Sequence, residues 1–323
     1  MRTSTKLLVL FLGLSVLMSA VFLVHCQNTT VDSAQTAVHD AYRALVEADK
    51  AGGDISKLAD QLNLALNFTS QAQALISSDP QKAQTLALQA QALAQNVTEQ
   101  ASTAKGEGLL QQPLTVAVTV TALLAGGVLV YLFGPKAFEK VWLRLRKNYR
   151  VRPENSTTQN KGLIITGKQV CAVILGITII IAFFAAAQFF LPKGTGEQFS
   201  ELGILGPNMK LADFPSEIVA GDPLDLNVYV GNQMGKPMYY VVMVKLGDND
   251  TIVNPANITP LQQFDKVVPN NGTWNFPVTV KLTKAGLNQR LIFELWIYNE
   301  TLNQNQYHER WGQVWLNVTA PVT

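Results

Sequence analysis

The chain has 323 residues, of which 48% are hydrophobic and only 15% are charged. A soluble domain usually has about 25% charged residues, so this composition indicates membrane-embedded segments. The net charge of +2 is too small for nucleic-acid binding by the whole chain. Of the only two cysteines, Cys26 lies at the end of the N-terminal apolar segment and Cys171 lies inside a later apolar run, which excludes a disulfide-stapled exported domain.

The N-terminal segment, residues 1–26, has the pattern of a secretory signal. Arg2 and Lys6 precede an apolar run from Leu7 to Val24, and polar residues follow it. This order is typical of a cleaved signal peptide, but the run is also long enough to stay in the membrane as a signal anchor. In both cases the chain that follows is exported.

Residues 27–112 are rich in Ala and Gln, which predicts a module of helices without strands. Gly52-Gly53 and Asp79-Pro80 mark the two connections, and a short hinge is expected over 106–113. His39 is interpreted as a surface residue in the first helix. The three helices are expected over residues 32–50, 54–77 and 79–104.

Two apolar stretches, 113–134 and 169–191, predict transmembrane helices. At 1.5 Å per residue, about 20 residues match the hydrocarbon thickness of a bilayer. Neither stretch contains Asp, Glu, Lys, Arg or His, which argues against a transporter or pump. The pair Gly126-Gly127 allows close approach of another helix, although a thin surface facing lipid explains it equally well.

The segment between the two apolar stretches, residues 135–168, is basic. It carries nine Lys or Arg and two acidic residues, a net charge of 9 − 2 = +7. Short basic loops stay in the cytoplasm during membrane insertion. Residues 27–112 and 192–323, on either side of the two spans, are therefore predicted to be extracellular.

Within this loop, aromatic and leucine residues recur at helical spacing between basic residues. The pattern predicts an amphipathic helix on an anionic membrane surface. A plain topology signal and a contact with the ribosome are the alternatives. The residues concerned are Phe138, Lys140, Trp142, Arg144, Leu145, Lys147, Tyr149 and Arg150.

The motif Asn-x-Thr, an acceptor of N-linked glycans, occurs nine times. One copy, Asn155, lies in the predicted cytoplasmic loop, where it should stay unmodified. The other eight lie in the exported segments, where glycans would protect a chain without disulfides. These predicted glycosylation sites are Asn28, Asn67, Asn96, Asn249, Asn257, Asn271, Asn299 and Asn317.

Residues 192–323 change to a strand pattern. Short runs rich in Val, Ile, Tyr and Trp are separated by turn residues, which is typical of an immunoglobulin-like β-sandwich. The predicted fold class is therefore an exported three-helix module, two transmembrane helices and a C-terminal all-β sandwich. The strands are expected over residues 202–205, 224–231, 238–246, 263–268, 274–282, 290–298 and 313–318.

The stretches "GNQMGKPMYY", "TWNFPVTV" and "RLIFELWIYN" in this region resemble the mainly archaeal membrane-protein family catalogued as domain of unknown function 1616. The resemblance covers about the last 130 of the 323 residues. It implies a membrane protein of an archaeal cell surface, to which the exported helical module is an addition. The family has no accepted reaction, so no catalytic residue is carried over.

The sequence contains no recognisable catalytic, metal-binding or cofactor-binding signature, and neither an enzyme activity nor a cofactor is predicted. His308 is interpreted as a loop residue, and Asp248-Asn249-Asp250 as a polar hairpin turn in preference to a calcium site. Trp296 is expected in the sandwich core. Trp311 and Trp315 flank the final loop and strand, and they are the candidates for contact with a partner.

These features predict a non-enzymatic, N-glycosylated, multi-pass protein of the cell membrane whose external modules bind or scaffold other cell-surface components. Its expected partners are membrane lipid, other membrane or envelope proteins and its own N-linked glycans. The alternative is an accessory subunit of a membrane-bound enzyme or export machine, of the translocon or oligosaccharyltransferase type. This alternative rests on the layout alone, an exported sandwich joined to a basic cytoplasmic segment.

Overall fold

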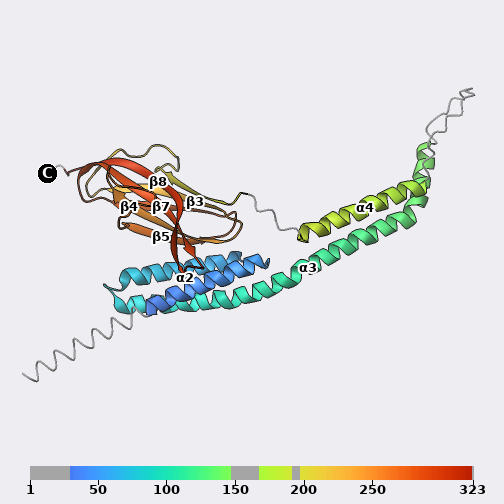
Figure 1. Cartoon of the computed structure of the whole chain (residues 1–323), viewed down its shortest axis with the longest axis horizontal. Coiled ribbons are helices and arrows are strands. Elements are labelled where there is room, and N and C mark those ends of the chain that lie inside the picture. The colour runs from blue at the N-terminus through green and yellow to red at the C-terminus, as the bar shows by residue number, and fades with distance from the viewer. Residues whose placement is uncertain (1–29, 147–166, 191–196, 322–323) are drawn as a thin grey trace, which may run out of the picture. The chain divides into compact units, whose positions relative to one another are not determined.

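The structure is a computed structural model that describes residues 30–146, 167–190 and 197–321. The chain divides into two compact units (Figure 1): one combines the residues up to 109 with those from 196 onward, and the other contains residues 110–195. The predicted signal segment and Asn28 lie outside the described residues, and so does Asn155.

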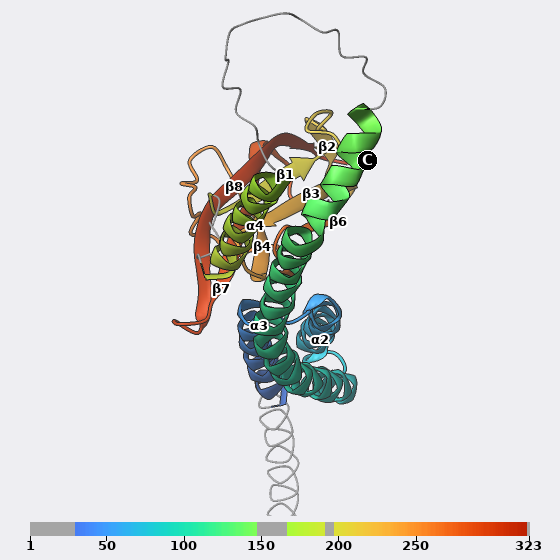
Figure 2. The ribbon, with the colours of Figure 1, turned by 90° about the vertical axis from the view of Figure 1, so that its right-hand side faces the viewer.

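Three helices lie side by side in the first unit (Figure 2): residues 30–50, α2 (Ser56–Leu75) and the first part of α3 (Pro80–Arg146). The first helix ends where the sequence predicts, since Gly52 adopts a φ of +83° that favours glycine. Asp79 caps the start of α3, where its carboxylate accepts a hydrogen bond of 3.1 Å from the backbone N–H of Lys82.

Small side chains allow these helices to pack closely. On α3 the buried residues recur every three or four positions, which places them on one face of the helix. The apolar residues of this face are Ala83, Ala87, Ala90, Ala94, Val97 and Ala101.

The predicted hinge over residues 106–113 is wrong, because α3 continues through it without a break. Gly108 lies within this continuous part of α3, where a close contact with another segment requires a glycine. A Cβ at this position would lie 2.5 Å from the carbonyl oxygen of Ala51 and 2.6 Å from the backbone nitrogen of Gly53. The glycine therefore permits close passage over the turn that ends the first helix, and one glycine in a helix costs only about 1 kcal/mol.

The rest of the first unit consists of two β-sheets. One has the strand order β1-β3-β6 and the other β2-β8-β7-β4-β5. All seven predicted strands are present. The bounds are β1 (Phe199–Leu205), β2 (Glu217–Val219), β3 (Pro223–Gln233), β4 (Met238–Gly247), β5 (Gln262–Val268), β6 (Thr273–Lys281), β7 (Gly286–Asn299) and β8 (Gln304–Thr319).

The sequence pattern missed β2, because three residues are too few to show an alternation. This strand pairs in parallel with the end of β8, and all other strand pairs are antiparallel. Alternate residues of both sheets point inward to a shared core. On β3 these are Leu224, Leu226, Val228 and Val230.

The outer face of the five-stranded sheet is also buried, because the helices pack against it. Tyr239 and Val241 of β4, Val267 of β5 and Tyr298 of β7 belong to one apolar cluster with Tyr42 and its helical neighbours. The helical module and the sandwich, separated by 86 residues of the second unit (195 − 110 + 1), thus form a single folded body.

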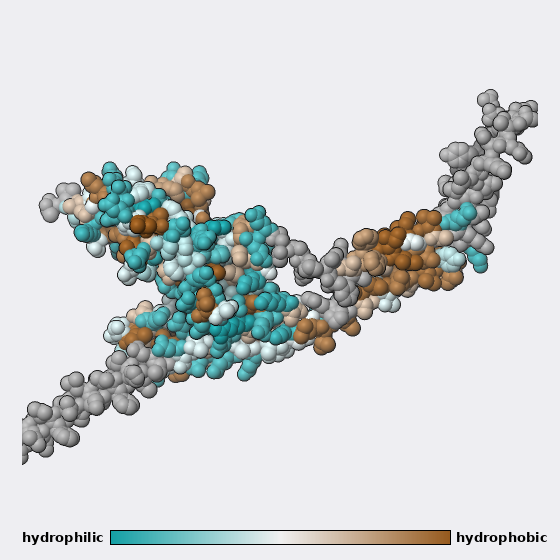
Figure 3. Space-filling view, in the orientation of Figure 1, coloured by the Kyte–Doolittle hydropathy of each residue, from teal (hydrophilic) through white to brown (hydrophobic). Residues whose placement is uncertain are grey.

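The second unit is built from the apolar part of α3 and from α4 (Gly167–Phe190). Hydrophobic side chains cover the surface of these helices (Figure 3). Among the described residues one helix, Pro80–Gly134, contains a stretch long and apolar enough to cross a membrane, and the described apolar part of α4, Ala172–Ala185, is shorter. Gly127 is buried against α4: a Cβ there would lie 3.1 Å from the Thr178 side chain.

Candidate functional site

Aromatic rings form the centre of the contact between the helices and the sheet. His39 stacks on Tyr298 with a centroid distance of 4.0 Å, and Tyr42 meets Tyr239 edge-on at 5.8 Å. Burial, together with the nearby Arg43 cation, lowers the pKa of His39 to about 4. The interpretation of His39 as a surface residue is therefore wrong: helical periodicity shows which residues share a face, but not that a sheet covers it.

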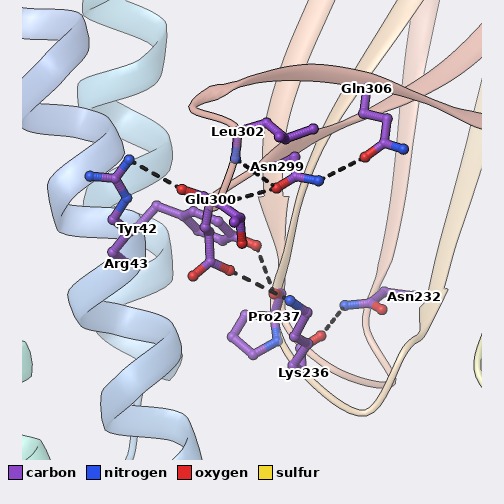
Figure 4. Close-up of polar contacts among 10 residues, drawn as sticks. Tyr42, Arg43, Asn232, Lys236, Pro237, Asn299, Glu300, Leu302 and Gln306 are labelled. Carbon is purple, nitrogen blue, oxygen red and sulfur yellow. Dashed lines mark hydrogen bonds and ion pairs between the residues drawn. The ribbon is translucent and has the colours of Figure 1, made fainter.

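Polar contacts fix the first helix to two hairpins of the sandwich (Figure 4). The Arg43 guanidinium donates to Tyr298 Oη at 3.1 Å and to Asn303 Oδ1 at 2.9 Å. The Tyr42 hydroxyl donates to the backbone carbonyl of Pro237 at 3.1 Å. These bonds connect one helix to the β3–β4 and β7–β8 turns at once, so they fix its orientation as well as its position.

A second fixed point joins α2 to β5. The Asn63 amide donates to the carbonyl of Val267 at 2.9 Å, and the N–H of Val267 donates to Asn63 Oδ1 at 2.8 Å. β5 is the last strand of its sheet, and Asn63 satisfies backbone groups on this strand.

Two adjoining cavities, which we call the seam cleft, lie between α2 and β5, with volumes of about 430 and 370 Å³. The larger, the aromatic cavity, contains side chains of β6. The smaller, the polar cavity, is lined mainly by amide, hydroxyl and ionisable groups. The residues that line both cavities are Leu66, Ser70, Gln263 and Asp265.

The aromatic cavity has a wall of three rings. Trp274 and Phe276 are stacked at 4.1 Å, and Phe264 lies 4.9 Å from Phe276. Asn67 of α2 also lines this cavity, and its side chain is exposed. One of the predicted glycosylation sites therefore lies beside the aromatic wall.

The polar cavity contains a carboxyl group in an unfavourable environment. Burial raises the pKa of Asp265 to about 6, and the amide of Gln263, 3.0 Å away, offsets only part of this cost. Among the described residues no salt bridge reaches Asp265. His39 lines the same cavity, which places two groups with opposite pKa shifts at one seam.

The predicted glycosylation sites differ in how exposed their asparagine residues are. Asn67, Asn96, Asn249, Asn257 and Asn271 are exposed. The half-buried Asn299 donates its amide to Gln306 at 2.7 Å, and Asn317 accepts a hydrogen bond of 2.9 Å from the backbone of Asn288. The last two sites are thus engaged in the fold.

The basic segment is described only in part. The backbone of α3 is helical as far as Arg146, which agrees with a helix in the first half of the segment. The membrane-surface prediction itself lies outside what the structure describes. This holds for the side chains of Phe138, Lys140, Trp142, Arg144 and Leu145, and for Lys147, Tyr149 and Arg150 as whole residues.

The two tryptophans predicted to contact a partner share one cation. The Arg290 guanidinium lies 5.7 Å from the Trp311 ring and 5.0 Å from the Trp315 ring. The two side chains remain 36% and 40% exposed, which leaves this Trp–Arg–Trp surface accessible. Trp296, expected in the core, instead faces the helices and donates to Glu294 Oε2 at 3.1 Å, so the prediction for this residue is corrected.

A serine–histidine pair has the spacing of a nucleophile and a base, but it is buried. His308 Nε2 lies 2.8 Å from Ser200 Oγ, and this oxygen lies 2.6 Å from the Tyr240 hydroxyl. Ser200 is only 3% exposed, so a substrate has no access to it. The pair belongs to the packing between β1 and β8, and His308 is in a strand, not in the predicted loop.

The sequence also gave no indication of an ion pair beneath the β4–β5 loop. Lys245 Nζ lies 2.7 Å from Glu294 Oε2, and both side chains are almost fully buried. Ala256 of the loop accepts from Lys245 at 2.8 Å and donates to Glu294 at 2.5 Å, which satisfies the pair. At the start of this loop Asp248 accepts from Thr251 at 2.7 Å in a polar turn, and the described residues contain no cluster of metal-ligating side chains.

Residues 192–318 match the model of the family described as Domain of unknown function (DUF1616). No curated protein matches the chain.

Among solved structures, a β-glucosidase from Listeria innocua is 12% identical, with a TM-score of 0.27 over 38% of this chain and 16% of that chain. The CARDB domain of the PF1109 protein from Pyrococcus furiosus is 12% identical, with a TM-score of 0.26 over 38% of this chain and 89% of that domain. This chain therefore spans a small fraction of the glucosidase. At these TM-scores neither structure supports a functional assignment.

Proposed function

We propose that the protein is an N-glycosylated, multi-pass protein of the cell membrane whose extracellular unit binds or scaffolds other cell-surface components. The observation that carries this proposal is that the first unit is built from two separate parts of the chain. Residues that precede the apolar helices and residues that follow them form one folded body.

This joining of two separate chain segments supports a topology in which the chain crosses the membrane twice. The helical module and the sandwich share a core, so they must lie on the same side of a membrane. If α3 crosses the membrane, the chain must return before residue 196, and the apolar helix α4 is the segment available for the return. The packing of Gly127 against α4 fits a pair of neighbouring spans.

The distribution of charge supports an orientation in which the first unit is extracellular. The segment between the spans carries a net charge of +7, which favours the cytoplasm, and seven Asn-x-Thr motifs lie in the described part of the other unit. The strand order also fits an immunoglobulin-like sandwich, since the first strands divide between the two sheets and later strands cross between them. Sandwiches of this type present loops and strand faces for binding, here including the Trp–Arg–Trp surface.

Glycan mapping of the protein purified from its native membranes tests this proposal. Intact-mass and glycopeptide analysis should find glycans at Asn249, Asn257 and Asn271, which are exposed in loops and turns. Asn155 should be unmodified, because it belongs to the segment of net charge +7 that is expected in the cytoplasm. A glycan on Asn155, or none at any site, would contradict the proposed topology.

Co-purification in mild detergent tests the role. Recovery of envelope proteins, reduced by Trp311→Ala or Trp315→Ala, is the expected result. The matched control is Trp296→Phe, since the half-buried Trp296 packs against the cluster between the sheet and the helices and is not part of the Trp–Arg–Trp surface. Recovery of ribosome or glycosylation components would instead favour the accessory-subunit alternative.

A further inference from the structure

We propose that the glycan attached to Asn67 folds back into the aromatic cavity of its own chain and covers the open side of the sandwich between β5 and β6. This inference rests on the proposed N-glycosylation of the first unit. It assigns a binding site to the seam cleft and names its occupant, a carbohydrate chain supplied in cis.

The position of Asn67 follows from its neighbour one helical turn earlier. Asn63 is held to β5 by hydrogen bonds of 2.9 and 2.8 Å in both directions. Side chains four residues apart lie on the same face of a helix, so Asn67 faces the same seam. It is exposed and lines the aromatic cavity, where an attached sugar would begin at the mouth.

The cavity offers both surfaces that a sugar needs. The half-buried ring of Phe276 lines the cavity and offers an apolar face to the C–H face of a hexose, and the buried ring of Trp274 stacks behind it at 4.1 Å and holds it in place. Ser70, Gln263 and Lys266 line the same cavity and supply hydroxyl, amide and ammonium groups for sugar hydroxyls. Its volume of about 430 Å³ lies within the usual range of small-ligand sites.

Covering this site has a structural benefit. β5 and β6 are the last strands of their respective sheets, so each has an edge without a neighbouring strand. The side chain of Gln262 bridges the gap at one point, with a hydrogen bond of 2.9 Å to the carbonyl of Thr279. Attachment through Asn67 would hold the glycan at an effective concentration of the order of millimolar, so the site would be mostly occupied if its intrinsic dissociation constant for the sugar lies below this concentration.

The structure also sets the order of events. Thr69, the third residue of the motif, is 6% exposed, and its hydroxyl donates to the Ala65 carbonyl at 2.9 Å. An enzyme that reads this threonine must act before α2 packs. Asn96 has the same helical setting, since Thr98 donates to Ala94 at 3.0 Å, but Asn96 does not line the cavity. Asn96 is therefore a matched control.

The test compares Asn67→Gln with Asn96→Gln in the full chain, purified from native membranes and mapped for glycans. Amide hydrogen exchange in residues 262–268 and 273–281 should become several-fold faster in N67Q and should not change in N96Q. A further variant, Phe276→Leu, keeps an apolar side chain, although a smaller one, and removes the ring face. In the F276L background, N67Q should have little additional effect on exchange.

Four outcomes decide the matter. Faster exchange in N67Q alone, removed by F276L, supports the docked glycan. Equal exchange in N67Q and in the unmutated chain, with Asn67 glycosylated, overturns it and leaves the proposed function intact. An unmodified Asn67 in a chain glycosylated elsewhere has the same meaning. If no site carries a glycan, the proposed function fails, and this inference fails with it.

Discussion

At the scale of single residues, two groups in the polar cavity should give opposite pH dependence of stability. The pKa of Asp265 is about 6 in the folded chain against an ordinary 3.8, so folding favours its protonated form. The free energy of unfolding should therefore rise as pH falls from about 6 to 4. The pKa of His39 falls from 6.5 to about 4, so folding favours its neutral form, and stability should fall over nearly the same range.

The two effects oppose each other in the unmutated chain, and single variants should separate them. Asp265→Asn should leave a chain that loses stability on acidification, and His39→Gln should leave one that gains stability. One proton contributes at most about 1.4 kcal/mol per pH unit. Urea unfolding between pH 7 and 4 measures both slopes. If the free energy of unfolding depends on pH in both variants as it does in the unmutated chain, Asp265 and His39 do not titrate with the pKa values given above.

At the scale of elements, the helices should stabilise the sandwich by covering one face of its larger sheet. Residues 197–323 alone should fold to a β-rich domain, because the core between the sheets is complete without the helices. In this isolated domain, however, the outer face of the five-stranded sheet would expose Tyr239, Val241 and Val267. Full burial of such side chains contributes about 1.5–3 kcal/mol each, so the isolated sandwich should be less stable and should tend to self-associate.

The comparison requires a matched protein in which a flexible linker replaces residues 110–195 and joins the helices to the sandwich. This protein should melt several degrees higher than residues 197–323 alone, as measured by differential scanning calorimetry. In the joined protein, Asn63→Ala should lower the melting temperature, because it removes both bonds to Val267. Equal melting temperatures for the joined and isolated forms would show that the helices do not stabilise the sandwich.

At the scale of the whole molecule, the two-crossing topology predicts the effect of removing α4. Deletion of residues 167–190 leaves one crossing, so the sandwich should remain in the cytoplasm while the helical module is exported. Asn249, Asn257 and Asn271 should then lose their glycans, and Asn96 should keep its own. An unrelated apolar helix of the same length in place of α4 should restore glycosylation of the sandwich. Glycans on the sandwich without any replacement would refute the two-crossing topology.

The sequence by itself determined the local structure of this protein. Gly52 and Asp79 end and start helices through backbone conformation and capping, which depend on a few neighbouring residues. Seven strands appeared as alternating runs between turn residues, and the C-terminal region was assigned to the correct family. These patterns depend only on residues within one helical turn or one strand, so they can be recognised in a single sequence.

Only the tertiary structure decided which surfaces meet. Asn63 and Val267 are 204 residues apart, and no local pattern indicates that they bond. The same holds for His39 on Tyr298, for Asp265 in the polar cavity and for Asn67 beside the rings of β6. A helix face of Ala, Leu and Tyr can pack on another helix, on a sheet or on lipid, since the hydrophobic effect is non-directional. Shape and hydrogen-bond complementarity between distant segments make the choice, and they exist only in the folded chain.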